Sequence, residues 1–200
     1  MRRVGKFLRY VAFIAMALVG LLGGMFIAGN TFADPGGWPA AGMTALWAIP
    51  MVALSVYALL RPAAAGPVLA GATGMVAVFT VVDSAFGIVP RDDWGPVAAV
   101  VVFALAVALA FLGLHQARLA GMLMILVGIA QLTATLIGVV IEAADGLGPD
   151  AIFRGSSGVV VLPLLIIGGL FLLAGSLEDL NGDGSGRVPT GGAANAHPRP

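Results

Sequence analysis

Most of the chain consists of apolar runs that are each about as long as a membrane-crossing helix. A helix needs roughly 20 predominantly apolar residues to cross the hydrocarbon core of a bilayer. Six segments meet this requirement, at residues 10–29, 41–60, 67–89, 96–114, 119–141 and 158–176. A helix is favoured in hydrocarbon because it satisfies its own backbone hydrogen-bonding groups. The sequence therefore predicts an all-α fold, a polytopic membrane helical bundle of six transmembrane helices with short loops.

The composition excludes most soluble classes of protein. Of the 200 residues, 60% are hydrophobic and only 10% are charged, whereas soluble domains carry about 25% charged residues. The formal net charge is zero, so no basic surface points to nucleic acid. The chain has no cysteine, which excludes disulfides, thiolate catalysis and cysteine-held iron–sulfur clusters.

The first apolar segment has two interpretations. It follows a basic start and precedes Thr31-Phe32-Ala33, which resembles a signal-peptide cleavage site. Its apolar run is longer than the usual signal-peptide core of about 7–15 residues. An uncleaved membrane anchor is therefore favoured over a cleaved signal peptide.

The basic residues predict the orientation of the bundle. With six spans, eight of the ten Lys and Arg residues fall on one side, and only Arg91 and Arg154 fall on the other. Because cytoplasmic loops are enriched in Lys and Arg, both termini are expected in the cytoplasm and the protein in the cell (plasma or inner) membrane. The eight are Arg2, Arg3, Lys6, Arg9, Arg61, Arg118, Arg187 and Arg199.

The transmembrane domain is expected over 1–177, followed by a disordered cytoplasmic tail over 178–200. The tail is rich in Gly, Pro, Ala and Asn and cannot bury enough apolar surface to offset the entropy of ordering. Residues 179–185 match the first half of an EF-hand calcium loop, but Gly186 and Thr190 replace the expected hydrophobic residue and glutamate. A solvated linker is therefore favoured over a calcium site.

Three parts of the sequence stand out together: Arg61-Pro62 with Val68-Leu-Ala-Gly71, residues 118–128, and residues 164–175. In these segments the chain resembles a group of small, uncharacterised multi-pass membrane proteins of actinobacteria. The resemblance implies a membrane-embedded helical protein and implies no activity.

Polar residues inside two predicted spans form the candidate intramembrane site. Asp83 lies in the third span with Thr80 and Ser84 on the same helical face. The fifth span carries a matching polar stripe, and Arg91 and Arg154 are the nearby cations expected on the same side of the membrane. The stripe consists of Gln131, Thr135, Gly138 and Glu142.

These two polar faces are expected to point inward and toward each other. A carboxylate within the membrane costs several kcal/mol unless it is paired, protonated or hydrated. The favoured interpretation of Asp83 is a hydrogen-bonded or ion-paired network that holds the bundle together. The alternative is a proton or cation site, or the floor of an outward-opening cavity.

No catalytic or cofactor-binding constellation is expected. Gly155-Ser156-Ser157-Gly158 fits the G-x-S-G pattern around the nucleophile of rhomboid proteases, which needs a histidine base. His115 and His197 are the only histidines, and both are predicted on the opposite side of the membrane. They also cannot supply intramembrane haem ligands or an H-E-x-x-H zinc site.

Small residues spaced four apart predict close helix contacts. They occur as Gly20-x-x-x-Gly24-x-x-x-Ala28 and as Ala130-x-x-x-Ala134-x-x-x-Gly138. The favoured function is a non-enzymatic accessory or assembly protein that acts through helix contacts in the lipid bilayer, with a partner membrane protein or a second copy of itself. The alternative is a small transporter or channel that uses Asp83, and a lipid-modifying enzyme ranks last.

Overall fold

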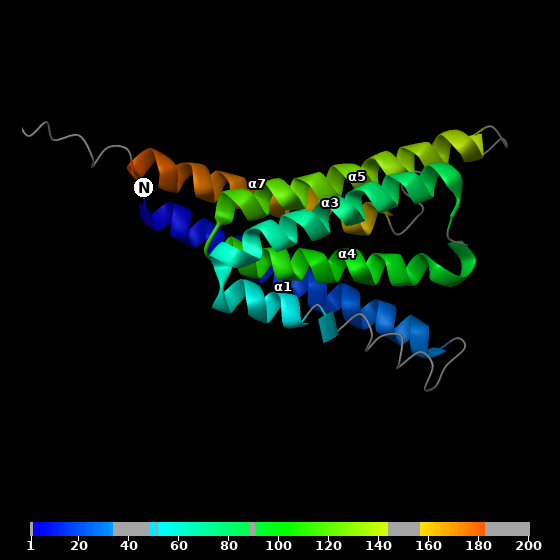
Figure 1. Ribbon diagram of the computed structural model, residues 1–200, viewed down its shortest axis with the longest axis horizontal. Coiled ribbons are helices and arrows are strands. Elements are labelled where there is room, and N and C mark those ends of the chain that lie inside the picture. The colour runs from blue at the N-terminus through cyan, green and yellow to red at the C-terminus, as the bar shows by residue number, and fades with distance from the viewer. Residues whose placement is uncertain (1, 34–48, 51, 89–90, 144–156, 183–200) are drawn as a thin grey trace, which may run out of the picture.

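Every element of the computed structural model is a helix over the residues that it describes, 2–33, 49–50, 52–88, 91–143 and 157–182. Figure 1 shows the helices lying side by side along one long axis. The predicted all-α bundle is confirmed. The helices are α1 (Arg2–Ala33), a segment at residues 52–60, α3 (Pro62–Phe86), α4 (Arg91–Gly113), α5 (Ala117–Ala143) and α7 (Ser157–Gly182).

Four of these helices are long and apolar enough to cross a membrane. Their apolar stretches are Arg3–Gly23, Pro62–Phe86, Ala117–Val140 and Val161–Asp179. The described part of α4 contains a shorter apolar stretch, Val101–Gly113. The chain is thus a multi-pass membrane protein by its helices. The second predicted span, 41–60, lies partly outside the described residues.

The helices extend beyond the apolar segments that predicted them. α1 includes the basic residues before position 10, α3 begins at Pro62 rather than 67, and α7 continues to Gly182 rather than ending at 176. Hydropathy marks the part of a helix that lies in hydrocarbon, whereas backbone hydrogen bonding continues into the interface. The first residues of the predicted tail are therefore helical, and residues 183–200 lie outside the described part of the chain.

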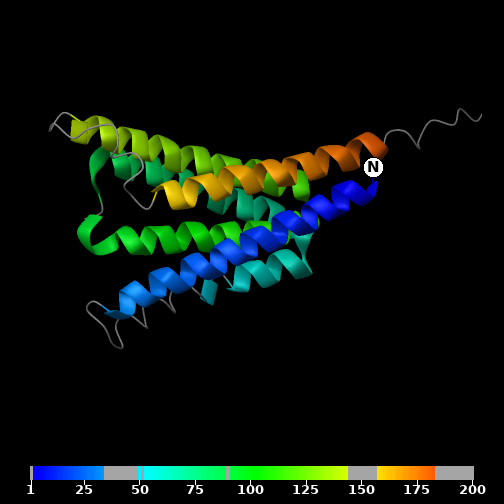
Figure 2. The same cartoon turned by 180° about the vertical axis from the view of Figure 1, so that it is seen from behind.

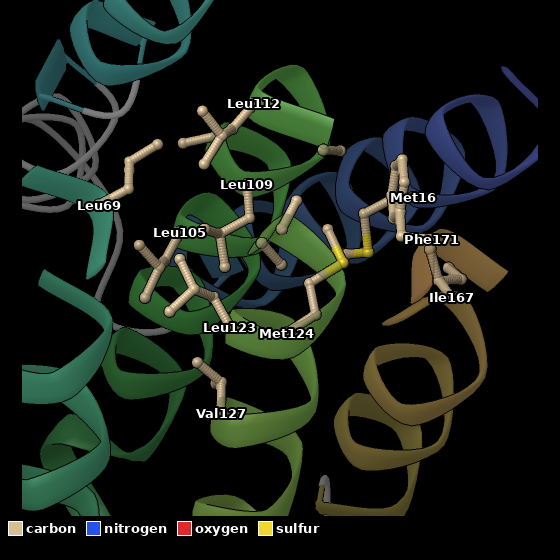
Figure 3. Close-up of a cluster of buried hydrophobic side chains, with 14 of the residues drawn as sticks. Met16, Leu69, Leu105, Leu109, Leu112, Leu123, Met124, Val127, Ile167 and Phe171 are labelled. Atoms are coloured by element: carbon tan, nitrogen blue, oxygen red, sulfur yellow. The ribbon is translucent and has the colours of Figure 1, made fainter. Parts of the chain in front are cut away.

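Helix α4 is the centre of the bundle. Its described side chains, from 101 to 113, are nearly all buried or half-buried, and it contacts α1, α3, α5 and α7. A helix that is apolar on all sides is stable when other helices surround it. Figure 3 shows Leu105, Leu109 and Leu112 along α4 and Leu123 and Met124 on α5, all within the main cluster of buried side chains. Phe111 also meets Phe13 of α1 edge to face, with ring centroids 5.0 Å apart.

Glycines set how closely the helices approach. A Cβ at Gly121 of α5 would lie 2.7 Å from the carbonyl oxygen of Gly168 and from the backbone nitrogen of Leu172, both in α7. Gly20 and Gly23 of α1 similarly lie against Val107 and Phe103 of α4. The predicted Gly20 face therefore packs against α4, while the side chains of the other two residues in that pattern lie outside the described set.

The outer surface of the bundle is apolar. On α1 the exposed large side chains recur at helical spacing, which places them on one stripe facing away from the other helices. Comparable stripes occur on α3, α5 and α7. Such a surface is compatible with lipid and not with water over this area. The α1 stripe consists of Val4, Phe7, Val11, Ile14, Leu18, Leu21, Leu22 and Met25.

The start of α1 and the end of α7 are joined by an ion pair. Arg9 donates a hydrogen bond from Nη1 to Oε2 of Glu178 at 3.3 Å, and the two side chains are only 15% and 31% exposed. Gly5 lies against the Glu178 side chain and the Ala174 carbonyl. Figure 2 shows the start of α1 and the end of α7 at the same end of the bundle.

We expect Gly121→Ala to lower the free energy of unfolding by about 1–3 kcal/mol, the usual cost of overpacking. The new methyl group would meet backbone atoms of α7, which cannot move aside as a flexible side chain can. Gly169→Ala is the matched control, because a Cβ there meets no described atom within 4 Å. Thermal unfolding in detergent should show a lower Tm for Gly121→Ala alone. An equal Tm for the two variants would show that the α5–α7 contact does not limit stability.

Candidate functional site

Helices α3 and α5 meet along the two polar faces that the sequence singled out. Gln131 Nε2 donates to Thr80 Oγ1 at 3.4 Å. Ser84 Oγ donates to the backbone carbonyl of Ala134 at 2.6 Å. We call Thr80, Ser84, Gln131 and Thr135 the polar seam. Because the two contacts lie one helical turn apart, they set the register between α3 and α5.

The remaining seam hydroxyl is satisfied within its own helix. Thr135 Oγ1 donates to the backbone carbonyl of Gln131 at 2.9 Å, and the neighbouring Thr133 makes the same kind of bond to Ile129. A threonine hydroxyl commonly bonds the carbonyl one turn earlier in a helix. Each member of the polar seam thus takes part in a hydrogen bond to a protein group.

Asp83 lies in the last turn of α3, because the helix ends at Phe86 rather than at 89 as predicted. Its side chain is half-buried. Its backbone carbonyl accepts a hydrogen bond from the N–H of Gly87 at 2.8 Å. Gly87 has a left-handed backbone conformation, with φ of 61°, that favours glycine and stops the helix. Asp83 is therefore closer to the end of its helix than predicted.

The three charged residues predicted near Asp83 are only partly described. Arg91 begins α4 and Glu142 lies near the end of α5, but their side chains lie outside the described part of the structure. Arg154 lies outside the described residues altogether. The ends of α3 and α5 and the start of α4 occupy the same end of the bundle in Figure 1.

A further polar residue on α3 was not predicted. Thr73 is fully buried, and its Oγ1 has no hydrogen-bond partner within the part of the chain that the structure describes. It shares the inward face of α3 with Ala77, Thr80 and Ser84, at helical spacing. Extending the Thr80–Ser84 face by two turns toward the start of the helix would have identified it in the sequence.

Substitutions at Asp83 and at Ser84 of the polar seam should lower stability by different amounts. Asp83→Leu should lower the Tm in detergent more than Asp83→Asn, because Asn keeps hydrogen-bonding groups and Leu does not. Ser84→Ala should lower the free energy of unfolding by about 0.5–1.5 kcal/mol, because the hydrogen bond to the Ala134 carbonyl is lost. Val82→Leu, on the exposed side of the same turn, should leave the Tm unchanged.

Indistinguishable Tm values for the wild type, Asp83→Asn and Asp83→Leu would contradict a structural role for Asp83. Ion flux through the same three proteins in liposomes tests the alternative, that Asp83 is a proton or cation site. If it is, both variants should lose the flux that the wild type shows. Val82→Leu again serves as the control for insertion and folding.

Chemically, the polar seam can donate and accept hydrogen bonds, and Asp83 adds one carboxylate at its end. The described residues contain no group of three or more His, Cys, Asp or Glu side chains placed to hold a metal ion. Neutral hydroxyl and amide groups in this arrangement fix helices against each other. No protein-family model, curated protein or solved structure matches the chain.

Proposed function

We propose that the chain is a six-span protein of the cell membrane, with both termini in the cytoplasm, that acts as a non-enzymatic accessory or assembly subunit through helix–helix contacts. The eight-to-two distribution of Lys and Arg supports the orientation. The four long apolar helices and the apolar outer surface support action within the bilayer. The two histidines and the lack of cysteine support the absence of an enzymatic role.

The observation that carries the proposal is a pair of glycines, Gly71 and Gly74, that pack against no other helix over the described residues. At Gly113, Gly121 or Gly128, a Cβ would come within 3.0 Å of another helix. Gly71 and Gly74 of α3 differ, because a Cβ at either would meet no described atom within 4 Å. Gly71 is exposed and Gly74 is half-buried. Both share a helical face with the exposed apolar side chains of Met75 and Val78.

Glycines at these positions lower the stability of α3, and no close contact with another described helix offsets this loss. Glycine lowers helix stability by about 1 kcal/mol relative to alanine. In lipid the compensation comes from close backbone approach of another helix. We therefore assign Gly71 and Gly74 to a contact with a transmembrane helix of another subunit, either a second copy or a partner membrane protein.

A small transporter or channel is the second candidate, and the buried Thr73 hydroxyl favours it. Together with Thr80, Ser84 and Asp83, Thr73 extends a line of polar groups along α3. The hydrogen bonds within the polar seam oppose this candidate, because they satisfy its groups without water or an ion. The ion-flux measurement on the Asp83 variants separates the two functions.

The orientation predicts opposite labelling at two glycines. Cysteines introduced by Gly148→Cys and Gly192→Cys should differ in intact cells treated with an impermeant thiol reagent. We expect the first to react and the second to be protected until the cells are permeabilised. The wild type, which lacks cysteine, gives the background. Labelling only at position 192 would reverse the orientation.

The assembly proposal predicts that stability and association change independently. Gly71→Ile with Gly74→Ile should leave the Tm of the monomer equal or higher, because glycine is a poor helix former. The same double variant should reduce association, because the branched side chains keep another helix at a distance. Association is measured by cross-linking in native membranes and by the mass of the purified complex.

Ala85→Ile is the matched control, since Ala85 is a small exposed residue on the same helix. It should leave association unchanged. If the wild type is monomeric and captures no membrane protein, or if the double glycine variant associates as the wild type does, the assembly proposal is wrong.

A further inference from the structure

A surface cavity lies at the end of the bundle opposite Asp83. It has a volume of about 410 Å³, within the range of small-ligand sites. One wall comes from His115 and Gln116 in the α4–α5 turn and from the first turn of α5, and the other comes from the end of α7. Gln116 also donates to the Pro62 carbonyl at 3.0 Å, which ties this wall to the start of α3. Asp83 is about 21 residues further along α3, roughly 30 Å away.

The rim of the cavity carries charges of both signs on two helices. Arg118 Nη1 of α5 donates to Oδ2 of Asp179 in α7 at 3.3 Å, and each side chain is 63% exposed. An ion pair this exposed contributes only about 0–1 kcal/mol, so a ligand that supplies both charges can replace it. Gly175 lets the backbone of Arg118 approach α7 closely, so the base of the arginine is fixed while its guanidinium remains accessible.

Glu178 also lines the cavity, but its carboxylate is directed to Arg9 of α1. Its Oε2 accepts from Arg9, and its Oε1 is buried. Asp179 instead has a side chain that is 63% exposed, and a carboxylate can accept several hydrogen bonds. A cationic donor in the cavity would thus meet the Asp179 carboxylate, with the Arg118 guanidinium close by.

The cavity also has an apolar wall, formed by Leu119 and Met122 of α5. Leu119 is half-buried, and Met122, one turn further into the apolar stretch of α5, is 47% exposed. The cavity lies where the apolar stretches Ala117–Val140 and Val161–Asp179 reach their ends. A ligand here therefore has its polar part at the membrane interface and its apolar part beside Met122.

We propose that this cavity binds the headgroup of a zwitterionic phospholipid with a primary ammonium group, of the phosphatidylethanolamine type. The phosphate accepts from the Arg118 guanidinium, the ammonium donates to the Asp179 carboxylate, and an acyl chain lies along Met122. A purely anionic headgroup would meet the Asp179 carboxylate at close range and offer it no hydrogen-bonding cation. A free cation would meet the Arg118 guanidinium and would not use the apolar wall. The proposal is independent of the assembly function.

The test uses full-length protein in detergent, titrated with phosphatidylethanolamine, phosphatidylcholine and phosphatidylglycerol of identical acyl chains. Native mass spectrometry gives an apparent Kd for each lipid. The wild type should bind phosphatidylethanolamine most tightly, because the trimethylammonium of phosphatidylcholine has no N–H donors. Soluble phosphoethanolamine should compete only weakly, since it lacks the acyl chains. Equal competition by the soluble compound would reassign the cavity to a free metabolite and overturn the lipid proposal.

Two variants and a matched control locate the site. Arg118→Gln should weaken phosphatidylethanolamine binding about tenfold, the effect of losing one charge-assisted hydrogen bond. Asp179→Asn should weaken it as well and raise the affinity for phosphatidylglycerol, because Arg118 is then free to bind an anion. Arg61→Gln removes an exposed arginine that does not line the cavity, and it should change neither affinity.

Each result decides the proposal once Tm values confirm that the variants are folded. Equal wild-type affinities for the three lipids would overturn it. So would unchanged binding in Arg118→Gln, or an equal loss in Arg61→Gln. A shift of Asp179→Asn from phosphatidylethanolamine toward phosphatidylglycerol supports it, because a purely structural role of the ion pair would weaken all three lipids alike.

Discussion

The bundle depends on the close backbone contact between α5 and α7. In lipid, apolar side chains gain little by leaving the bilayer for the protein interior, so association relies on packing and hydrogen bonds. Gly121 and Gly168 provide that packing, since neither places a side chain between the two backbones. With α5 held against α7, α4 can be enclosed on all sides, and α1 can cross it at Gly20 and Gly23. The remaining contacts build outward from this pair.

Different interactions hold the helices together at the two ends of the bundle. Near the end of α3, neutral groups bond helix to helix, as in the Ser84–Ala134 contact. At the other end, charged side chains pair across helices, and Arg9 with Glu178 is the more buried example. Neutral hydrogen bonds suit a position inside hydrocarbon, whereas ion pairs suit the interface, where water lowers the cost of charge. One end of the bundle is thus held by neutral hydrogen bonds, and the other carries ion pairs, of which Arg118–Asp179 is exposed.

The sequence was sufficient for the fold class and for the meeting of α3 with α5, because long apolar runs and polar residues four apart each have one favourable arrangement in lipid. It placed helix ends poorly, as at Gly182, because hydropathy reports hydrocarbon and not hydrogen bonding. It could not pair Arg118 with Asp179, since many neighbours are available to an exposed side chain. The small-residue patterns gave no partner either, and geometry alone separates Gly121, which is packed, from Gly71, which is open.

Because α7 contacts both α1 and α5, it joins helices that are synthesised before it. During translation, Gly121 and Gly128 of α5 face lipid or other proteins until the segment around Gly168 has entered the membrane. Arg9 likewise cannot form its ion pair until Glu178 has been synthesised, 169 residues later. The glycine face of α5 is therefore exposed during synthesis until α7, which packs against it, has entered the membrane.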